Sequence, residues 1–374
     1  MVEKERVSLC NDKEVKNGKY VLYWMQASQR AHFNPALEYA VLVANTMNKP
    51  LIVLFCIMPE YLTASFRHYQ FMIEGLQETA QTIRGYGAAF IIKAGDPCEI
   101  IKELSESSSM IVFDFAYLDF MKAVRKKISA QTACRVVQVE GNVVVPVAAA
   151  SSKEEYSAAT LRPKVSAVIS KYLNSEEEIT ELKNKISDPQ IESLTEQQAK
   201  EYIKKFRTNN RYFDESRFIG GYSHARQKLD DFIKYKLHNY ADMKNDPTSE
   251  VQSDLSPYLH FGQISPVYIA NQITKVLSES AQEYLEELIV RRELAHNFVM
   301  YNDDYAQYNS VPAWAKKTLA EHLSDPREHC YSQKQLEDAQ THDEYWNSAQ
   351  NELLLTGKMH NYMRMYWGKK IIEW

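Results

Sequence analysis

Five runs dominated by apolar residues occur in the first 150 residues, and they constrain the fold more than any other feature. They span residues 20–25 (YVLYWM), 50–58, 88–93, 110–115 and 135–139. Strands buried on both faces have this continuous apolar composition, whereas half-exposed strands alternate apolar and polar residues. Helical stretches lie between the runs, over residues 35–47, 66–86, 97–105 and 119–130. This alternation predicts an α/β domain with a Rossmann-like, doubly wound parallel sheet and helices on both faces.

The second half of the chain has a different pattern. From about residue 198 onward no strand pattern is present, and helical periodicity recurs over residues 225–237, 266–276, 281–301, 332–340 and 343–374. This predicts an all-α C-terminal domain. We therefore expect four segments, namely a charged N-terminal tail (1–18), an α/β domain (19–150), an interdomain linker with helices (151–200) and a helical domain (201–374).

Composition excludes several protein classes. Lys and Arg number 44 against 49 Asp and Glu, so the net charge of −5 does not fit a uniformly basic nucleic-acid coat, although a local basic groove remains compatible with it. The five cysteines are scattered without a CxxC or Cys/His cluster, which argues against a disulfide framework and a structural metal site. Residues 1–18 are charged, and no apolar run approaches the roughly 20 residues of a membrane helix. We expect a cytoplasmic protein.

Three loops that precede helices offer backbone N–H groups to an anion. Gly95-Asp96-Pro97 follows a strand, and Gly220-Gly221-Tyr222 and residues 253–262 (SDLSPYLHFG) precede helical patterns. Hydroxyls and backbone N–H groups at a helix start suit a pyrophosphate. The alternatives are an ordinary turn with Pro97 in the first helical turn and a helix capped by Ser256 before Pro257.

Residues 286–298 (EELIVRRELAHNF) place carboxylates and arginines within two turns of an otherwise apolar helix. One interpretation is a set of surface ion pairs at i,i+4 spacing, such as Glu287 with Arg291. The other is a carboxylate that hydrogen-bonds a base while the arginines hold phosphates.

Three tryptophans, Trp346, Trp367 and Trp374, lie in the last 30 residues. Trp367 and Trp374 are seven residues apart, so on one helix they share a face about 10 Å apart along the axis. Aromatic core packing and an electron-transfer path both fit this stripe. Arg364 precedes Trp367 by three residues and faces nearly the same way, where it fits beside a negatively charged ring system.

Taken together, these motifs resemble the photolyase/cryptochrome flavoproteins, and specifically the class II cyclobutane pyrimidine dimer photolyases. The resemblance covers residues 18–374 and rests on ordered motifs, which are 23–34 (Tyr-Trp-Met, then Gln-Arg and Asn), 154–164 (Glu-Glu-Tyr, then TLRPK), 245–247 (NDP), 255–265 (LSPYLHFGQIS), 287–294 (ELIVRREL) and 360–374 (HNYMRMYWGKKIIEW). Val290 stands where class I relatives carry a Trp, in agreement with class II. Residues 140–147 (EGNVVVPV) depart from the pattern, and the family pattern continues for several dozen residues past Trp374.

The resemblance implies two binding domains. The α/β domain would hold an antenna chromophore, a deazaflavin or a folate, and the helical domain a bent, non-covalently bound FAD. The residues implied for the FAD phosphates and ribityl chain are Tyr240, Gln252, Ser253, Asp254, Leu255 and Ser256. Arg364 would lie beside the isoalloxazine ring.

The resemblance also implies the residues of repair. Glu287 matches the carboxylate that hydrogen-bonds the flipped dimer, and Met365 lies where the lesion packs. DNA contacts are implied for Lys244, Arg291 and Arg292, and the flavin-reducing chain would run from Trp367 through Trp346 to Trp374 at the surface.

The expected function is light-driven repair, in which reduced FAD sends an electron to a flipped-out pyrimidine dimer, the cyclobutane ring splits and the electron returns. The alternatives are a cryptochrome-like flavin photosensor and a shortened, catalytically impaired remnant that binds DNA. The expected partner is damaged DNA, bound by a monomer without membrane contact. Other basic residues are candidates for contact with DNA, and the alternative is that they only cover solvated helix faces. They are Lys204, Lys205, Arg207, Arg211, Lys358, Lys369 and Lys370.

Overall fold

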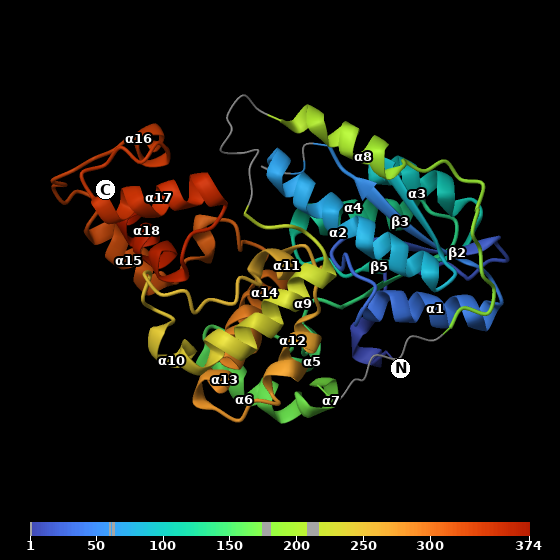
Figure 1. Cartoon of the computed structure of the whole chain (residues 1–374), viewed down its shortest axis with the longest axis horizontal. Helices are drawn as coiled ribbons and strands as arrows, with labels where there is room; N and C mark the ends of the chain where they lie inside the picture. The colour runs from blue at the N-terminus through green and yellow to red at the C-terminus, as the bar shows by residue number, and fades with distance from the viewer. Residues whose placement is uncertain (1, 60, 62–63, 174–180, 208–216) are drawn as a thin grey trace.

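The computed structural model describes residues 2–59, 61, 64–173, 181–207 and 217–374, and its first half contains a six-stranded sheet (Figure 1). The strand order is β1-β6-β5-β2-β3-β4, with all pairs parallel except β1 with β6. The strands are β1 (Val7–Leu9), β2 (Tyr20–Met25), β3 (Leu51–Ile57), β4 (Ala89–Ala94), β5 (Ser108–Asp114) and β6 (Arg135–Val139). The five strands predicted from the apolar runs are confirmed to within two residues at each end.

Helices cover both faces of this sheet (Figure 1). One face packs against α1 (Pro35–Met47), α2 (Phe66–Gly85) and α8 (Glu196–Ile203), and the other against α3 (Pro97–Ser105) and α4 (Asp119–Gln131). Along β2, Val21 and Tyr23 face the first layer, whereas Leu22 and Trp24 face the second. Both side-chain sets are buried, and the strands therefore show no polar alternation in the sequence.

The expected N-terminal tail takes part in the sheet. A 3-10 turn η1 (Lys4–Arg6) leads into the edge strand β1, which pairs antiparallel with β6. The buried guanidinium of Arg6 donates hydrogen bonds to the carbonyl oxygens of Val143 (3.2 Å) and Val144 (2.7 Å). The description of this segment as a tail is therefore wrong for residues 4–9, because a short edge strand lacks a distinctive sequence signal.

The second half is helical, and no strand occurs within residues 217–374. Short helices α5 (Val147–Ala150), α6 (Ala158–Val168) and α7 (Ser170–Leu173) follow the sheet, and the 3-10 turn η2 (Lys204–Phe206) follows α8. The next elements are α9 (Tyr222–Asp231), η4 (Phe232–Lys236), η5 (Leu237–Asn239), α10 (Tyr240–Met243), α11 (Ser256–His260), α12 (Pro266–Ile273), α13 (Glu279–Leu285), η6 (Glu286–Arg291) and α14 (Arg292–Tyr301). They surround a second apolar core, to which Phe71 of α2 contributes from the α/β half.

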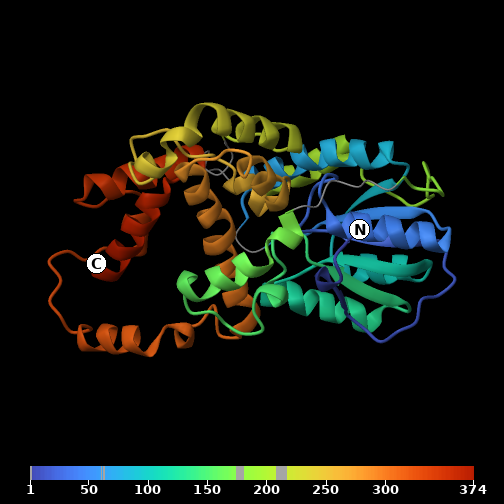
Figure 2. The same ribbon diagram turned by 90° about the horizontal axis from the view of Figure 1, so that it is seen from below.

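The last segment contains η7 (Tyr308–Ser310), α15 (Ala313–Glu321), α16 (Gln333–Glu337), α17 (Glu344–Thr356) and α18 (Asn361–Glu373). In the view of Figure 2 these elements form the end of the molecule farthest from the sheet. The continuous helix predicted over 343–374 is wrong, since Gly357 adopts a left-handed conformation (φ 76°) that ends α17. The predicted helix 281–301 is interrupted by the π-helical turn η6, and α15 was not predicted.

The two halves are joined through buried polar contacts. The guanidinium of Arg30, fully buried, donates to the carbonyl oxygens of Gly141 (2.7 Å) and Gly262 (3.0 Å) and to Oδ1 of Asn142 (3.0 Å). Gly262 belongs to the loop after α11, whereas Arg30 follows β2. Each of these backbone acceptors would lose a buried partner without Arg30, so the contact holds the helical half in a defined position against the sheet.

Candidate functional site

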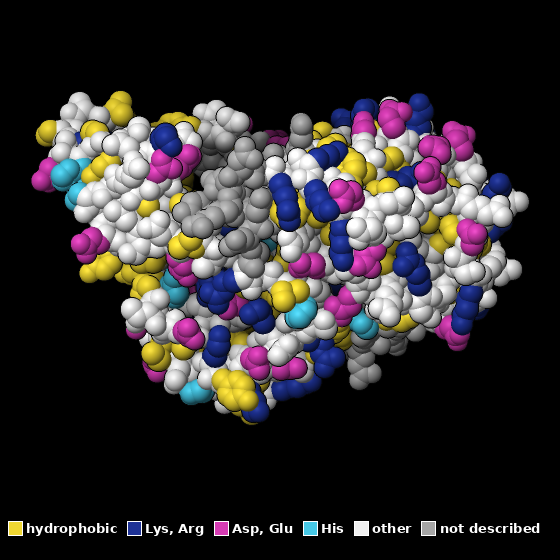
Figure 3. Space-filling view, turned by 45° about the horizontal axis from the view of Figure 1, so that its top comes forward, with side chains coloured by type: hydrophobic (Ala, Val, Ile, Leu, Met, Phe, Trp, Pro, Cys, Tyr) yellow, Lys and Arg dark blue, Asp and Glu magenta, His cyan; other side chains and the backbone are white. Residues whose placement is uncertain are grey.

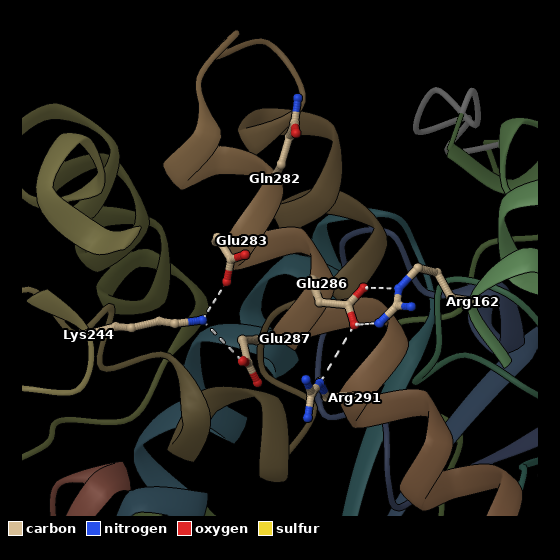
Figure 4. A pocket seen from close by; sticks show the side chains of 7 residues that line it. All are labelled: Arg162, Lys244, Gln282, Glu283, Glu286, Glu287 and Arg291. Atoms are coloured by element: carbon tan, nitrogen blue, oxygen red, sulfur yellow. Dashed lines mark hydrogen bonds and ion pairs between the residues drawn. The ribbon is translucent and has the colours of Figure 1, made fainter. Parts of the chain in front are cut away.

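A pocket of about 400 Å³ opens on the helical half beside Glu287 (Figure 4). Its lining residues are Arg162, Lys244, Gln282, Glu283, Glu286, Glu287 and Arg291. They come from α6, the end of α10, α13 and η6, so four separate elements position one charged cavity. The predicted site residues Lys244, Glu287 and Arg291 are thus brought together.

The pocket contains ion pairs from the π-helical turn η6. Arg291 Nε lies 3.6 Å from Oε1 of Glu286, five residues earlier. The predicted i,i+4 pair of Glu287 with Arg291 is not formed among the described residues, since Glu287 pairs with Lys244. Arg162 makes a bidentate contact with the Glu286 carboxylate, with Nη2 2.8 Å from Oε1 and Nε 3.0 Å from Oε2. This bonding lowers the pKa of the Glu286 carboxyl.

Glu287 faces Lys244 instead. The Lys244 ammonium lies 2.6 Å from Oε2 of Glu283 and 3.4 Å from Oε1 of Glu287, between the two carboxylates (Figure 4). Partial burial acts to lower the pKa of Lys244, but its bonds to these carboxylates outweigh burial and raise the pKa. Lys244 is therefore charged at neutral pH, and the Glu287 side chain, 39% exposed, remains open toward the pocket.

The predicted phosphate-contacting loop lies between α10 and α11. Gln252 donates its amide to the carbonyl oxygen of Lys244 (2.9 Å) and lies 3.1 Å from Nε2 of His360. Ser253 Oγ accepts a hydrogen bond from the hydroxyl of Tyr284 (3.1 Å). Leu255 is buried and Ser256 is exposed at the first position of α11. The alternative in which Ser256 caps this helix is wrong, since no side-chain cap is present there.

Asp254 lies in the middle of a group of basic side chains, hereafter the cation cluster, comprising Arg217, Lys228, Lys236 and Lys358. Its carboxylate oxygens lie 2.6 Å from Lys358 Nζ and 3.4 Å from Arg217 Nη2. Lys236 Nζ donates to the carbonyl oxygen of Gln252 (3.3 Å). Burial lowers the pKa of Lys228, Asp254 opposes this effect, and the other three cations lower the pKa further. Four cations around one carboxylate leave an excess of positive charge that an anionic ligand would neutralise.

Sequence reasoning missed most of the cation cluster. Arg217, Lys228 and Lys236 were not singled out, and Lys358 was assigned to DNA. The four residues come from the segment before α9, from α9 and η4, and from the loop between α17 and α18. The eight-residue spacing of Lys228 and Lys236, about two helical turns, was the detectable signal.

Tyr240 lies beside the Glu287 pocket, with the Lys244 ammonium 5.8 Å from the centre of its ring. Its ring packs edge-on against Tyr284 and Phe232, with centroids 5.3 and 5.7 Å away. Burial, followed by the charges of neighbouring acidic groups, raises the pKa of Tyr240 above its usual value. The hydroxyl therefore stays protonated at neutral pH and is a hydrogen-bond donor.

The three predicted tryptophans form one stack. Trp346 is fully buried and lies between the others, its ring centroid 5.1 Å from that of Trp367 and 5.4 Å from that of Trp374. Trp346 Nε1 donates to the carbonyl oxygen of Leu336 (3.2 Å). The break at Gly357 makes this possible, because it folds α18 back against α17 and brings residues of both helices together.

Arg364 and Met365 are exposed on α18, with half of the Met365 surface accessible. Arg364 lies close enough to His360 for its charge to contribute to a lowered pKa of that imidazole, for which burial is the main cause. His360 in turn contacts Gln252, so the helix that carries Arg364 begins beside the loop next to the cation cluster.

The chain is similar to known proteins over its whole length. The family model described as DNA photolyase matches residues 21–184. The deoxyribodipyrimidine photo-lyase of Methanothermobacter thermautotrophicus is 41% identical across all of this chain, which covers 82% of that relative. The chain belongs to the DNA photolyase family. The deoxyribodipyrimidine photo-lyase of Arabidopsis thaliana is 37% identical over 95% of the chain and 74% of the relative.

Solved structures of the family share the fold described above. A Synechocystis cryptochrome superposes with a TM-score of 0.74 at 16% identity, covering 94% of this chain and 74% of that one. A Sulfolobus tokodaii photolyase superposes with a TM-score of 0.69 at 20% identity, covering 94% and 74% respectively. The predicted fold class, a Rossmann-like α/β domain followed by a helical domain, is confirmed.

Arg292, a predicted DNA contact of this photolyase-family chain, is less exposed than Arg291. It is half-buried, and its Nη1 atom is enclosed without a hydrogen-bond partner among the described residues. Burial lowers its pKa, and the neighbouring Glu293 and Tyr117 oppose that effect. The DNA contact by Arg292 stays a prediction. The helical twist turns adjacent arginines to different sides, and a sequence motif does not show which of them is the more exposed.

Basic and acidic side chains are interspersed over the face shown in Figure 3 and do not form one positive field. Lys205 lies over the Tyr202 ring (3.5 Å) and Arg207 over the Phe66 ring (4.4 Å), so both are held by aromatic contacts beside α8. Arg211 lies outside the described residues. Across the described part of the chain, no helix has both the length and the apolar character needed to cross a bilayer.

Proposed function

We propose that this chain is a class II photolyase that repairs cyclobutane pyrimidine dimers in DNA by light-driven electron transfer from FAD. The observation that carries the proposal is the 41% identity to a deoxyribodipyrimidine photo-lyase over the entire chain, including the helical half beyond the matched family model. Val290, which follows the Glu-Leu-Ile run, supports class II. The same division of the chain makes residues 19–150 the antenna-binding domain and 201–374 the FAD- and DNA-binding domain.

The described residues fit an FAD. The cation cluster, with Lys358 2.6 Å from Asp254, provides the positive charge that a pyrophosphate requires, and the loop 252–256 adds amide and hydroxyl groups beside it. Arg364 on α18 would lie toward the isoalloxazine ring. When bound, the flavin supplies the excited-state electron. The protein contributes binding, orientation and electrostatics.

Recognition of the dimer is assigned to the Glu287 pocket. A dimer inside a duplex is out of reach, and its weakened pairing and stacking reduce the cost of moving it out of the helix. Glu287, open toward the pocket, would hydrogen-bond the base edge of the flipped dimer. Lys244 and Arg291, on either side of it, would hold phosphates, and Met365 on α18 would pack against the lesion.

Trp367, Trp346 and Trp374 are proposed as the path by which the flavin is photoreduced. Their stacking order, with Trp346 in the middle and contacts of 5.1 and 5.4 Å, supports this assignment. An antenna chromophore in the α/β domain is part of the same proposal. The solved structure of the Sulfolobus tokodaii photolyase contains two FAD molecules, which supports a second chromophore in this fold.

The test is a light-dependent repair assay with FAD-loaded protein and an oligonucleotide that contains one thymine dimer. We expect repair in the light only. Glu287→Gln should lower the repair yield at least about tenfold while FAD content stays unchanged, because the proposed donor to the dimer radical anion is a protonated Glu287 carboxyl, whose acidic O–H makes a stronger hydrogen bond to an anion than an amide N–H does.

Glu283→Gln is the matched control, because it also removes a carboxylate bonded to Lys244 but lies one turn away on α13. It should lower the yield by less than about twofold. Flavin photoreduction without any repair would contradict the proposal and favour the cryptochrome-like photosensor. Equal loss of repair and FAD content in Glu287→Gln would contradict the role of Glu287.

A further inference from the structure

Asp254 is a buried carboxylate at the centre of the cation cluster. Its side chain is 7% exposed, with Oδ1 2.6 Å from Lys358 Nζ and Oδ2 3.4 Å from Arg217 Nη2. We propose that Asp254 is an internal anion that occupies a phosphate position in the ligand-free protein and that the pyrophosphate of a ligand replaces it there. This inference rests on the proposed function, because FAD is the pyrophosphate ligand that the function requires.

Cations hold the Asp254 carboxylate, and its own loop does not. Among the described residues, no backbone N–H group or hydroxyl donates a hydrogen bond to it. Asp246, at a nearby turn, does have such a donor, the backbone N–H of Thr248 (2.8 Å). A ligand that takes both cations from Asp254 therefore removes the contacts that keep its carboxylate in place.

The backbone of Asp254 supports the same conclusion. Its φ is 57°, in the left-handed region that residues with a Cβ rarely adopt. Aspartate tolerates this conformation where its side chain hydrogen-bonds the backbone nearby. Asp254 lacks that bond, so its ion pairs with Lys358 and Arg217 stabilise the conformation. Loss of these ion pairs would allow the residue to return to an ordinary conformation, with its carboxylate outside the cluster.

The cation cluster requires an anion even when no ligand is bound. Its four cations come from separate segments, which only tertiary packing brings together. Burial lowers the pKa of Lys228, the charge of Asp254 opposes this effect, and the other three cations lower the pKa further, so the cations repel one another. Without a counter-ion this repulsion would destabilise the ligand-free fold.

A pyrophosphate matches the contacts that Asp254 makes. Each carboxylate oxygen faces one cation, and two linked phosphates present one anionic group to each of the same two cations. The pyrophosphate also brings two negative charges where the carboxylate has one, so it neutralises the cluster more completely. Arg217 and Lys358 are both partly exposed, and a ligand can therefore reach them from solvent.

The test compares Asp254→Asn with wild type in the absence and in the presence of inorganic pyrophosphate. Without ligand, the melting temperature of Asp254→Asn should be lower by about 2–4 °C, because the cations lose their counter-ion. Saturating pyrophosphate should remove this difference. In calorimetric titrations, Asp254→Asn should bind pyrophosphate and FAD about tenfold more tightly than wild type, since no carboxylate has to be displaced.

Two further variants complete the experiment. Asp230→Asn, an exposed change on α9, is the control and should match wild type in both measurements. The double change Asp254→Asn with Arg217→Gln has less repulsion to overcome during folding. It should recover part of the ligand-free melting temperature and bind pyrophosphate more weakly than Asp254→Asn does.

Three results would overturn the inference and leave the proposed function standing. A loss of melting temperature that pyrophosphate does not remove would show that Asp254 only supports the fold. Tighter binding without such a loss would show a carboxylate that repels phosphates from beside their site. Asp254→Asn could also equal wild type in both measurements. Wild-type protein that neither binds FAD nor repairs dimers, together with rescue of Asp254→Asn by pyrophosphate, would contradict the proposed function alone.

Discussion

The carboxylate of Glu78 on α2 accepts hydrogen bonds from the backbone N–H (3.0 Å) and the hydroxyl (3.0 Å) of Ser223 in the first turn of α9. The N-cap position of α9 is Gly221, which has no side chain to cap the helix. A Cβ at Gly221 would lie 2.6 Å from Glu78 Oε2, and the backbone φ there is 132°. A residue of the α/β half thus caps a helix of the other half.

This contact predicts a loss of stability in Glu78→Ala. The first turn of α9 would lose its acceptor and a favourable negative charge, and we expect the free energy of unfolding to fall by about 1–2 kcal/mol. Urea unfolding followed by circular dichroism measures it. Gln81→Ala, an exposed change on the same helix, should stay within about 0.5 kcal/mol of wild type, and equal effects of both would refute the cap.

Glu293 predicts a pH dependence of stability. Its carboxylate accepts hydrogen bonds from the backbone N–H groups of Val144 and Val145 (3.3 Å for the latter), and complete burial raises its pKa to about 8. The folded protein holds a proton that the unfolded chain releases, so the free energy of unfolding should decrease as pH rises toward 8. His296, whose pKa burial lowers to about 3, acts in the opposite sense below its ordinary pKa of 6.5.

The window between pH 6.5 and 8 separates Glu293 from His296, because His296 is neutral there in both states. Burial also raises the pKa of Glu140, which acts in the same sense as Glu293. Wild type should lose up to about 2 kcal/mol across this window through Glu293, and the decline should be smaller by that amount in Glu293→Gln. Denaturant titrations at several pH values provide the measurement. Glu286→Gln is the control, since Arg162 lowers that carboxyl's pKa and its contribution is lost only in acid. A decline of undiminished size in Glu293→Gln would disprove the assignment.

The cation cluster predicts a selective loss of flavin affinity in Lys358→Gln. Removing the ammonium 2.6 Å from Asp254 leaves that carboxylate to repel a pyrophosphate, and FAD should bind roughly fivefold to tenfold more weakly. Riboflavin has no pyrophosphate, so its affinity should not change. Titration followed by flavin fluorescence tests both ligands. Lys369→Gln, an exposed change on α18, is the control, and an equal loss for FAD and riboflavin would place the phosphates elsewhere.

The anion sites predicted from loops show where sequence reasoning ends. Gly95-Asp96-Pro97 forms an ordinary helix start, because the Asp96 side chain accepts the backbone N–H of Cys98 (2.8 Å). At Gly220-Gly221 the helix start is real, but Glu78 occupies the position that an anion would take. In both places a carboxylate of the chain satisfies the backbone donors. Only Asp96 lies close enough in the sequence to the backbone donor that it satisfies for the sequence to predict the contact.

The sequence by itself determined the layered α/β half, the helical half and the order of the family motifs. Local sequence patterns suffice for these features. In β2, for example, successive side chains point to opposite faces that are both buried, so a few neighbouring apolar residues identify the strand. Tertiary structure decided which side chains meet. Arg291 and Arg292 are adjacent, yet Arg291 is exposed and Arg292 half-buried, and Trp346 contacts Trp367 only because Gly357 turns the chain back. Such contacts depend on the packing of distant segments, for which no local period exists.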